Sequence, residues 1–264
     1  MQEFDIFNLA LLQVQVFLLV AIRISALFFT APVIGSKNIP VLMKIALSFM
    51  LAMLVYPVLE TKGVAMPDDV MTYGIVILNQ VVMGVVIGFS AYLIFAAIQL
   101  AGQIIDLQMG FGIANVIDPV SGTQVSIIGQ FQFVLGMLLF LAINGHHHLF
   151  QAVTDSFRLV PLGHEGFSAA TAGRLSELFS QLFLVAFKIA GPATLALFLT
   201  NVTLGFIART IPQMNVFIVG LPLNIMVGIA AVLISLPILI NMFHTLLSTM
   251  WEDVYFLIRS MRVS

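Results

Sequence analysis

Long apolar stretches separated by short polar turns dominate this chain. Six of the stretches are long enough to cross a bilayer, for which about 20 residues suffice. They span roughly residues 9–34, 41–59, 71–100, 127–144, 178–207 and 216–243. Polar turns at 35–38 and 209–215 are short enough to join the first pair and the last pair as helical hairpins. The pattern therefore predicts an all-α integral membrane protein built from helical hairpins.

Two further regions lie outside this pattern. The longest polar connection, residues 146–177, predicts a small exposed helical segment. After the last stretch, heptad-like apolar spacing predicts an amphipathic helix, carried by Leu247, Met250, Val254, Leu257 and Met261. Such a helix either lies at an interface or on a partner, or is an ordinary terminal helix.

Two charged residues, Arg23 and Lys188, lie well inside apolar stretches. A charge at the centre of a membrane helix costs about 2.5–3.5 kcal/mol on insertion scales, so it must find a partner or snorkel to the interface. Pairing within a protein interior is the favoured interpretation of these buried charges. Asp106 and Asp118 are the candidate acidic partners.

Prolines within the stretches point in the same direction. Pro192, Pro222 and Pro237 each interrupt a helical run, and proline removes a backbone hydrogen bond and kinks a helix. Together with the two charges, they predict kinked, partly buried helices that pack against protein neighbours more than against lipid.

Residues 106–124, between the third and fourth stretches, are rich in glycine and polar groups. Such backbone cannot face lipid, because its N–H and C=O groups would stay unpaired. The segment must therefore be buried in protein or line an aqueous path. Gln99, Gln103 and Asp106 lead into it along one helix face. This polar stripe predicts a pore lining or a subunit contact, with a satisfied hydrogen-bond network inside the chain as the alternative.

The composition agrees with a membrane protein and excludes several functions. Of 264 residues, 61% are hydrophobic and 8% are charged, against about 25% charged in soluble domains. A net charge of −2 without a basic cluster gives no footprint for nucleic acid, and the lack of cysteine excludes thiol chemistry. The consecutive histidines His146, His147 and His148 point about 100° apart on a helix and cannot share one metal geometry. No enzyme, metal site or cofactor is predicted, since no zinc-protease or serine-hydrolase signature occurs.

Several motifs in the chain resemble those of one known family. They are Asp118-Pro-Val-Ser-Gly-Thr-Gln-Val-Ser-Ile-Ile-Gly-Gln-Phe131, Asn144-Gly-His-His-His-Leu-Phe150, Leu221-Pro-Leu-Asn-Ile-Met-Val-Gly228 and Gly35-Ser-Lys-Asn-Ile-Pro40. In these motifs and in their order, the chain resembles the FliR family of flagellar type III export-gate proteins over essentially its whole length. The virulence-type secretion homologues are more distant.

The resemblance implies a non-enzymatic pore subunit of the flagellar export gate, which translocates flagellar proteins across the bacterial inner membrane during flagellum assembly. One copy would assemble with FliP-like and FliQ-like subunits into a helical cone in the flagellar basal body, in association with FlhB-like and FlhA-like export proteins. The chain would form one export-gate membrane domain, with a FliP-like part at about 1–205 and a FliQ-like hairpin and amphipathic tail at about 206–264.

The resemblance also implies that residues 106–124 plug the closed channel. The predicted plug residues are Met109, Gly110, Phe111, Gly112, Ile113, Ile117 and Asp118. Adaptable apolar side chains can close a pore to water and ions, and glycines supply the backbone freedom to move aside. A small-molecule secondary transporter is the alternative function, since broken helices, midplane charges and a weak hairpin repeat occur in such carriers.

Overall fold

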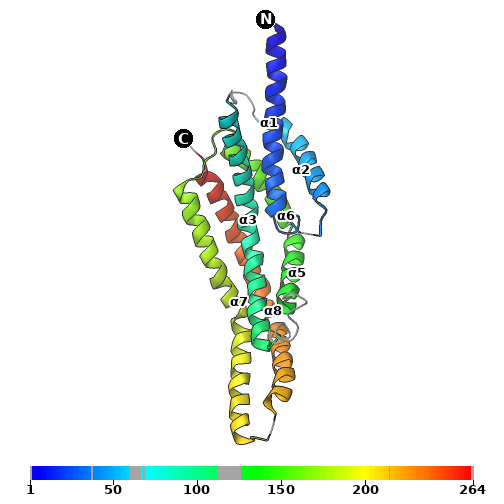
Figure 1. Ribbon diagram of the computed structural model, residues 1–264, viewed down its shortest axis with the longest axis vertical. Helices are drawn as coiled ribbons and strands as arrows, with labels where there is room; N and C mark the ends of the chain where they lie inside the picture. Colours follow the sequence, from blue (N-terminus) through cyan, green and yellow to red (C-terminus); the bar gives the residue numbers. More distant parts are fainter. Residues whose placement is uncertain are drawn as a thin grey trace. The chain divides into compact units, whose positions relative to one another are not determined.

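The chain folds as a series of helices (Figure 1). The computed structural model describes residues 2–36, 38–59, 67, 69–111, 126–213 and 215–262, with side chains from residue 11 onward. The elements are α1 (Gln2–Thr30), α2 (Val41–Val55), the 3-10 turn η1 (Tyr56–Val58), α3 (Val70–Met109), α5 (Ile127–Ala142), α6 (Gly145–Leu159), α7 (Ala169–Thr210) and α8 (Val216–Ser260). Within these described ranges, β pairing is confined to an isolated bridge between Glu165 and Arg262. The predicted all-α fold is confirmed.

Most of the helices are long and apolar enough to cross a membrane. Five described helices meet this condition, and α5 and α6 add a sixth span only if they are taken together across their break. Asn144 lies at that break in the left-handed backbone region, with φ 58°, which asparagine tolerates better than most residues. The six predicted stretches all fall on these helices, but α3, α7 and α8 reach 40, 42 and 45 residues and extend well beyond them.

The predicted polar connection at 146–177 is mostly helical, because α6 and the start of α7 occupy it. The expectation of an exposed segment is wrong for α6. Its Leu149, Ala152 and Val153 are 0% exposed, since they recur on one face of the helix and meet the apolar core.

The predicted amphipathic tail is the last part of α8 rather than a separate helix. Its apolar positions are all buried within the chain: Leu247, Met250, Val254, Leu257 and Met261. Of the two alternatives, an ordinary terminal helix packed on its own chain describes it. Pro222 and Pro237 lie inside α8 without ending it.

The chain clusters into two compact units, and several helices contribute to both. The first unit comprises Met1–Leu93, Phe140–Leu178 and Ser248–Ser264, and the second comprises Ile94–Leu139 and Phe179–Leu247. The predicted division near residue 205 lies inside α7. The assignment of a FliP-like and a FliQ-like part therefore follows no break between helices and stays a prediction.

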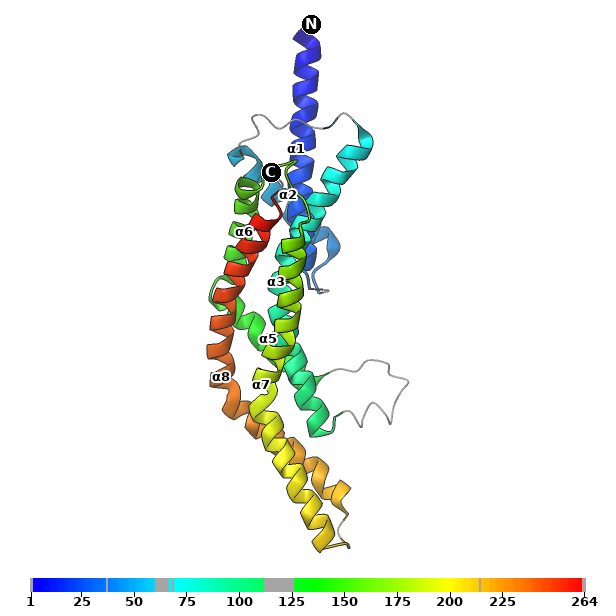
Figure 2. The same ribbon diagram turned by 90° about the vertical axis from the view of Figure 1, so that its left-hand side faces the viewer.

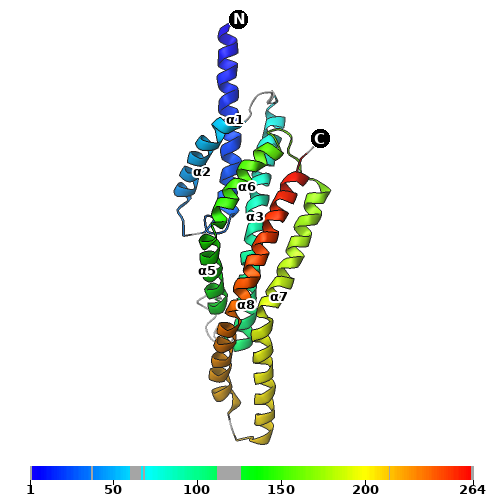
Figure 3. The same cartoon turned by 180° about the vertical axis from the view of Figure 1, so that it is seen from behind.

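In the first unit, α1 packs on α3 through two glycines. A Cβ atom at Gly84 would lie 2.3 Å from the carbonyl oxygen of Arg23, and one at Gly88 would lie 2.1 Å from Thr30 Oγ1. The four-residue spacing puts both glycines on one face, so the two backbones approach closely. Beside them, α2 lies against α1 as the second arm of the predicted N-terminal hairpin (Figures 1 and 3).

In the second unit, α7 and α8 form the other predicted hairpin, with their arms joined at 211–215 (Figure 2). The ring of Phe95 contacts those of Phe133 and Phe243, with centroids 6.0 and 5.9 Å apart, so α3, α5 and α8 meet there. The inward side of α7 is buried at regular helical spacing, at Leu182, Ala186, Ile189, Ala193, Leu197 and Leu204.

Candidate functional site

The two helix ends that flank the predicted plug are bonded to each other in the second unit. Asp106, in the last turn of α3, accepts hydrogen bonds from Ser126 Oγ at 2.5 Å and from the backbone N–H of Ile128 at 3.1 Å. Ser126 Oγ in turn accepts from the N–H of Gly129 at 2.9 Å. The unpaired N–H groups of the first turn of α5 are thus capped both locally and from α3. We refer to Asp106, Ser126 and this first turn as the neck.

Helix α3 ends at the neck in a glycine turn. Gly110 has φ 91°, and its N–H donates to the carbonyl of Leu107 at 3.2 Å, while the N–H of Phe111 donates to the carbonyl of Asp106 at 3.1 Å. These two bonds form a Schellman motif, whose left-handed residue is usually glycine because a Cβ atom is disfavoured there. Gly110 therefore ends α3.

Close backbone packing holds the neck together. A Cβ atom at Gly102 of α3 would lie 2.2 Å from the Cα atom of Gly129 in α5. A Cβ atom at Gly228 of α8 would lie 2.5 Å from Cγ of Met109. A side chain at Gly102 would push α3 and α5 apart, and one at Gly228 would displace the Met109 side chain, so α3 contacts both α5 and α8 at this level.

Three of the predicted plug residues can be placed. Met109 is 0% exposed and packs on Gly228, whereas Gly110 and Phe111 are half-buried. The predicted Gly112, Ile113, Ile117 and Asp118 lie outside the described residues. Packing within the chain therefore holds Met109 in this structure. Its role in a movable seal is not tested by that contact and stays a prediction.

The predicted polar stripe is not uniform. Gln103 is exposed, Gln99 is half-buried and Asp106 is buried. Asp106 already has its hydrogen-bond partners at the neck, so the alternative of a network inside the chain describes this residue. Gln103 is the stripe residue whose side chain remains exposed on the chain, and the lining or contact role stays a prediction for it.

Arg23 lies at the centre of a buried polar cluster in the first unit. Its Nε donates to Gln80 Oε1 at 2.8 Å, its Nη1 to Ser156 Oγ at 3.0 Å and its Nη2 to Glu165 Oε1 at 2.5 Å. Its Cζ also lies 4.1 Å from the ring centroid of Phe157. The side chains of Arg23 and Glu165 are both 0% exposed. One guanidinium therefore joins α1, α3, α6 and the connection that precedes α7, and we call these residues the Arg23 cluster.

Glu165 extends the Arg23 cluster to the end of α8. Its Oε1 accepts a second hydrogen bond from Gln80 Nε2 at 2.6 Å, and its Oε2 accepts from the N–H of Gly163 at 2.9 Å. The N–H of the next residue, Gly166, donates to the carbonyl of Met261 at 2.9 Å. The buried carboxylate is therefore fully engaged, and the connection around it holds the last residues of α8.

The acidic partner expected for Arg23 is corrected by this arrangement. The partner is Glu165, which is 142 positions away in the sequence. Asp106 is instead bonded at the neck, and Asp118 lies outside the described residues. Sequence reasoning missed Glu165 because it stands in a polar connection that resembled a solvated loop. Gln80, a polar amide side chain inside an apolar stretch, is the sequence feature that could have indicated a buried polar cluster.

The burial expected for Lys188 is also corrected. Its side chain is exposed on α7, on the side of the helix opposite the buried positions of α7. Among the described residues it forms no ion pair or hydrogen bond. The sequence pattern led to the same expectation for Arg23 and Lys188, but Arg23 is buried and paired whereas Lys188 is exposed.

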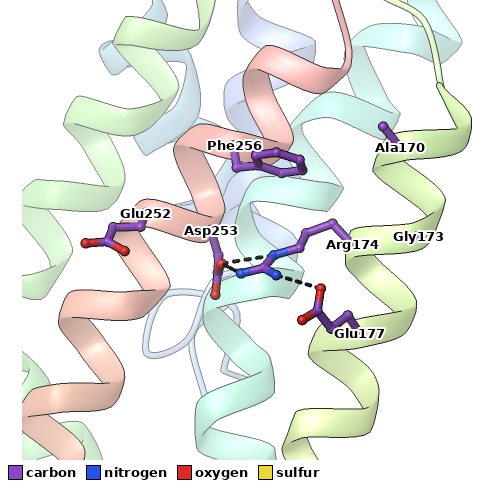
Figure 4. A pocket seen from close by; sticks show the side chains of 7 residues that line it. All are labelled: Ala170, Gly173, Arg174, Glu177, Glu252, Asp253 and Phe256. Carbon is purple, nitrogen blue, oxygen red and sulfur yellow. Dashed lines mark hydrogen bonds and ion pairs between the residues drawn. The ribbon is translucent and has the colours of Figure 1, made fainter.

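A pocket of about 530 Å³ in the first unit was not expected from the sequence (Figure 4). Arg174 of α7 pairs there with Asp253 of α8, and its Nη1 donates to Glu177 Oε2 at 2.6 Å. Phe256 lies with its ring centroid 5.8 Å from the guanidinium carbon, and Glu252 points away from it (Figure 4). Arg174, Glu177 and Asp253 are mutually paired, so these charges join α7 to α8 at the pocket.

The described residues offer no cluster of side chains for a metal ion. Among them, no three histidine or acidic side chains are grouped so that they could hold a metal ion. The adjacent rings of His146 and His147 have centroids 4.3 Å apart, and His148 contacts Trp251 at 5.1 Å. These histidines therefore make ring contacts at the start of α6.

Comparison with known proteins gives a consistent result. Residues 14–250 match the family described as bacterial export proteins, family 1. The chain is 37% identical to the flagellar biosynthetic protein FliR of Bacillus subtilis (strain 168), over 89% of this chain and 92% of that protein. It is 31% identical to FliR of Escherichia coli (strain K12), over 83% of both chains. FliR of Aquifex aeolicus (strain VF5) is 32% identical over 82% of this chain and 83% of its own length.

Proposed function

Because the chain belongs to family 1 of the bacterial export proteins, we propose that it is a non-enzymatic pore subunit of the flagellar type III export gate, through which flagellar proteins cross the inner membrane. Its curated relatives are flagellar biosynthetic proteins, and its helices are long and apolar. The chain is therefore a membrane-embedded component of flagellar export. The comparisons give no support to the alternative of a small-molecule secondary transporter.

The observation that carries the pore proposal is the neck. Asp106 bonds Ser126 and Ile128, and Gly102 contacts Gly129 directly. The described residues on either side of positions 112–125 are thus anchored at one place in the second unit. The plug predicted between them would therefore be anchored at both ends by the packing of α3 and α5, and this anchoring supports the proposal.

The sequence of the tethered segment suits that role. It contains Ile113 and Ile117, whose apolar side chains would exclude water and ions from a closed pore. It also contains polar residues and glycines, which are tolerated at membrane depth only where protein or water surrounds them. We therefore assign closure to the predicted plug residues, which are Met109, Gly110, Phe111, Gly112, Ile113, Ile117 and Asp118, and anchoring to Asp106 at the end of α3.

Exposed apolar surface supports assembly with other helical subunits. In the second unit, Leu184, Phe187 and Leu195 of α7 are 60, 63 and 61% exposed, and Ile218 and Ile234 of α8 are 71 and 78% exposed. Surface of this kind must be covered by lipid or by other apolar helices. We propose FliP-like and FliQ-like subunits as neighbours in a helical cone, in the basal body, with FlhB-like and FlhA-like proteins in association.

Co-purification tests the proposed function. The tagged chain, expressed alone and together with the FliP-like and FliQ-like chains of the same bacterium, should form a stable detergent-soluble complex only in the second case. Loss of the gene should abolish flagellin in the culture medium, and the wild-type gene should restore it. A chain that is monodisperse by itself, joins no complex and binds a small solute would contradict the proposal.

A further inference from the structure

Lys188 stands in the middle of the apolar part of α7 without a partner. It is the one charged residue between Glu177 and Arg209. Its side chain is exposed, and no described residue pairs with it. An uncompensated charge at the centre of a membrane helix costs about 2.5–3.5 kcal/mol. Unless its ammonium group snorkels to the membrane surface, it needs an anion from outside the described part of the chain.

The surroundings of Lys188 form an exposed apolar face on α7. Leu184, Leu195 and Leu199 share its side of the helix, and they are 60, 61 and 57% exposed. Nothing lies within 4 Å of a Cβ atom placed at Gly191, one turn further along. A small residue beside a row of leucines lets another helix approach closely. We refer to Leu184, Lys188, Leu195 and Leu199 as the Lys188 face.

Lys44 shows how the same chain satisfies an intrahelical lysine internally. It is the one charged residue of α2, yet it is only 5% exposed. Its Nζ donates to the carbonyl of Gly35 at 2.9 Å and lies 5.6 Å from the ring centroid of Phe29. The outward side of α2 is consequently free of charge. Lys188 has neither a carbonyl nor an aromatic partner, and it points outward.

We propose that the Lys188 face docks an apolar helix of another export-gate subunit, and that a carboxylate on that helix pairs with Lys188. The inference rests on the proposed function and names the chemistry of one of its contacts. Charge complementarity selects the occupant. An aspartate or glutamate inside an apolar helix bears the same kind of insertion penalty as Lys188, and pairing relieves both. Burial of the ammonium and the carboxylate between two helices also strengthens the electrostatic attraction between the two charges.

Charge variants of Lys188 in the co-expressed complex test the pairing. Lys188→Arg should preserve the complex, Lys188→Met should lower its yield several-fold, and Lys188→Glu should abolish it, because two carboxylates would then face each other. Replacing the partner's carboxylate with lysine should restore assembly of the Lys188→Glu chain. Arg158→Glu, which reverses an exposed charge on α6, is the matched control and should leave the yield unchanged.

A photo-crosslinking amino acid at Leu195 identifies what covers the Lys188 face. An adduct with a co-expressed subunit, mapped to a helix with an internal carboxylate, is the expected result. Adducts with lipid alone would assign the face to the bilayer and overturn the inference. Rescue of Lys188→Glu by Asp118→Lys in the same chain would overturn it too. Intact assembly of Lys188→Glu would refute the docking face while leaving the pore proposal standing, whereas a wild-type chain that joins no complex refutes the proposed function itself.

Discussion

Glu165 is a buried acceptor that links several elements of the first unit. Its carboxylate accepts hydrogen bonds from Arg23, Gln80 and the N–H of Gly163. A buried ion pair adds little net stability compared with well-packed apolar residues, since both charges lose their hydration. Removing one partner is nevertheless costly, because the other charge stays buried without compensation. The Arg23 cluster therefore specifies how α1, α3 and α6 meet more than it strengthens their packing.

Substitution of Glu165 should reveal this asymmetry. Glu165→Gln should lower the free energy of unfolding by about 3–5 kcal/mol, because Arg23 keeps its charge in a site that is 0% exposed. The double variant Arg23→Met with Glu165→Leu should recover most of that loss. Denaturant unfolding of the purified chain in detergent measures both effects.

Glu177→Gln is the matched control for this substitution. It removes the same charge from an exposed pair with Arg174, in which the Glu177 side chain is 54% exposed. Such pairs contribute at most about 1 kcal/mol. If Glu165→Gln and Glu177→Gln lowered the free energy of unfolding equally, removing a charge from the Arg23 cluster would cost no more than removing one from an exposed pair.

Individual residues show where sequence reasoning succeeds and where it stops. Arg23 was expected to be buried and paired because a charge cannot stay inside an apolar helix unaided. Its partner Glu165 is distant in sequence, and nothing in local pattern reports a contact of that range. Lys188 obeys the same rule, but the anion it needs is not among the described residues. The rule therefore predicts that a partner exists without saying which chain supplies it.

At the scale of helices, small residues decide which elements touch. Gly84 and Gly88 bring α3 against α1, Gly102 and Gly129 bring α3 against α5, and Gly228 receives Met109. In each case a Cβ atom would lie closer to a neighbouring atom than the sum of their van der Waals radii, so space favours glycine, most strongly where the neighbour is backbone, as at Gly84 and Gly102. These contacts fix the level at which each helix pair crosses.

Paired substitutions of two glycines in α3 test this packing. Gly84→Val should destabilise the chain by at least about 1–3 kcal/mol, the range for overpacking, because its Cβ would lie 2.3 Å from the carbonyl oxygen of Arg23. Gly74→Ala meets nothing within 4 Å and should stabilise the helix by about 0.5–1 kcal/mol. Thermal unfolding of the two variants compares them directly, and a tolerated Gly84→Val would contradict close packing of α1 on α3.

Helix identity was predictable from the apolar stretches, whereas helix length was not. The stretch at 216–243 predicted a membrane helix, yet α8 continues to Ser260. After residue 243, Met250, Val254 and Leu257 are buried, most polar residues are exposed, and the buried Asp253 pairs with Arg174. An amphipathic end packed on the same chain looks, in sequence, like a separate interfacial helix. The exposure predicted for 146–177 failed for the same reason within α6, whose apolar face is buried.

At the scale of the whole molecule, the two compact units carry different features. The first contains the Arg23 cluster, whose polar groups are satisfied within the chain. The second contains the neck, the exposed α7–α8 hairpin and Lys188, which has no partner among the described residues. Both units expose large apolar side chains, such as Val70 and Met71 in the first and Ile218 and Ile234 in the second, so we expect both to contribute contacts with other subunits.

The leak of ions through the assembled gate tests the plug most directly. Residues 112–118 are replaced by a glycine–serine linker of equal length, which leaves Met109, Asp106 and the neck intact. The control is Leu107→Ser, a change at a residue of α3 that is 64% exposed and lies outside the replaced segment. In vesicles containing the co-expressed complex, the linker variant should leak ions several-fold faster than the wild type and the control. An intact complex with an unchanged leak would contradict the assignment of this segment as the plug.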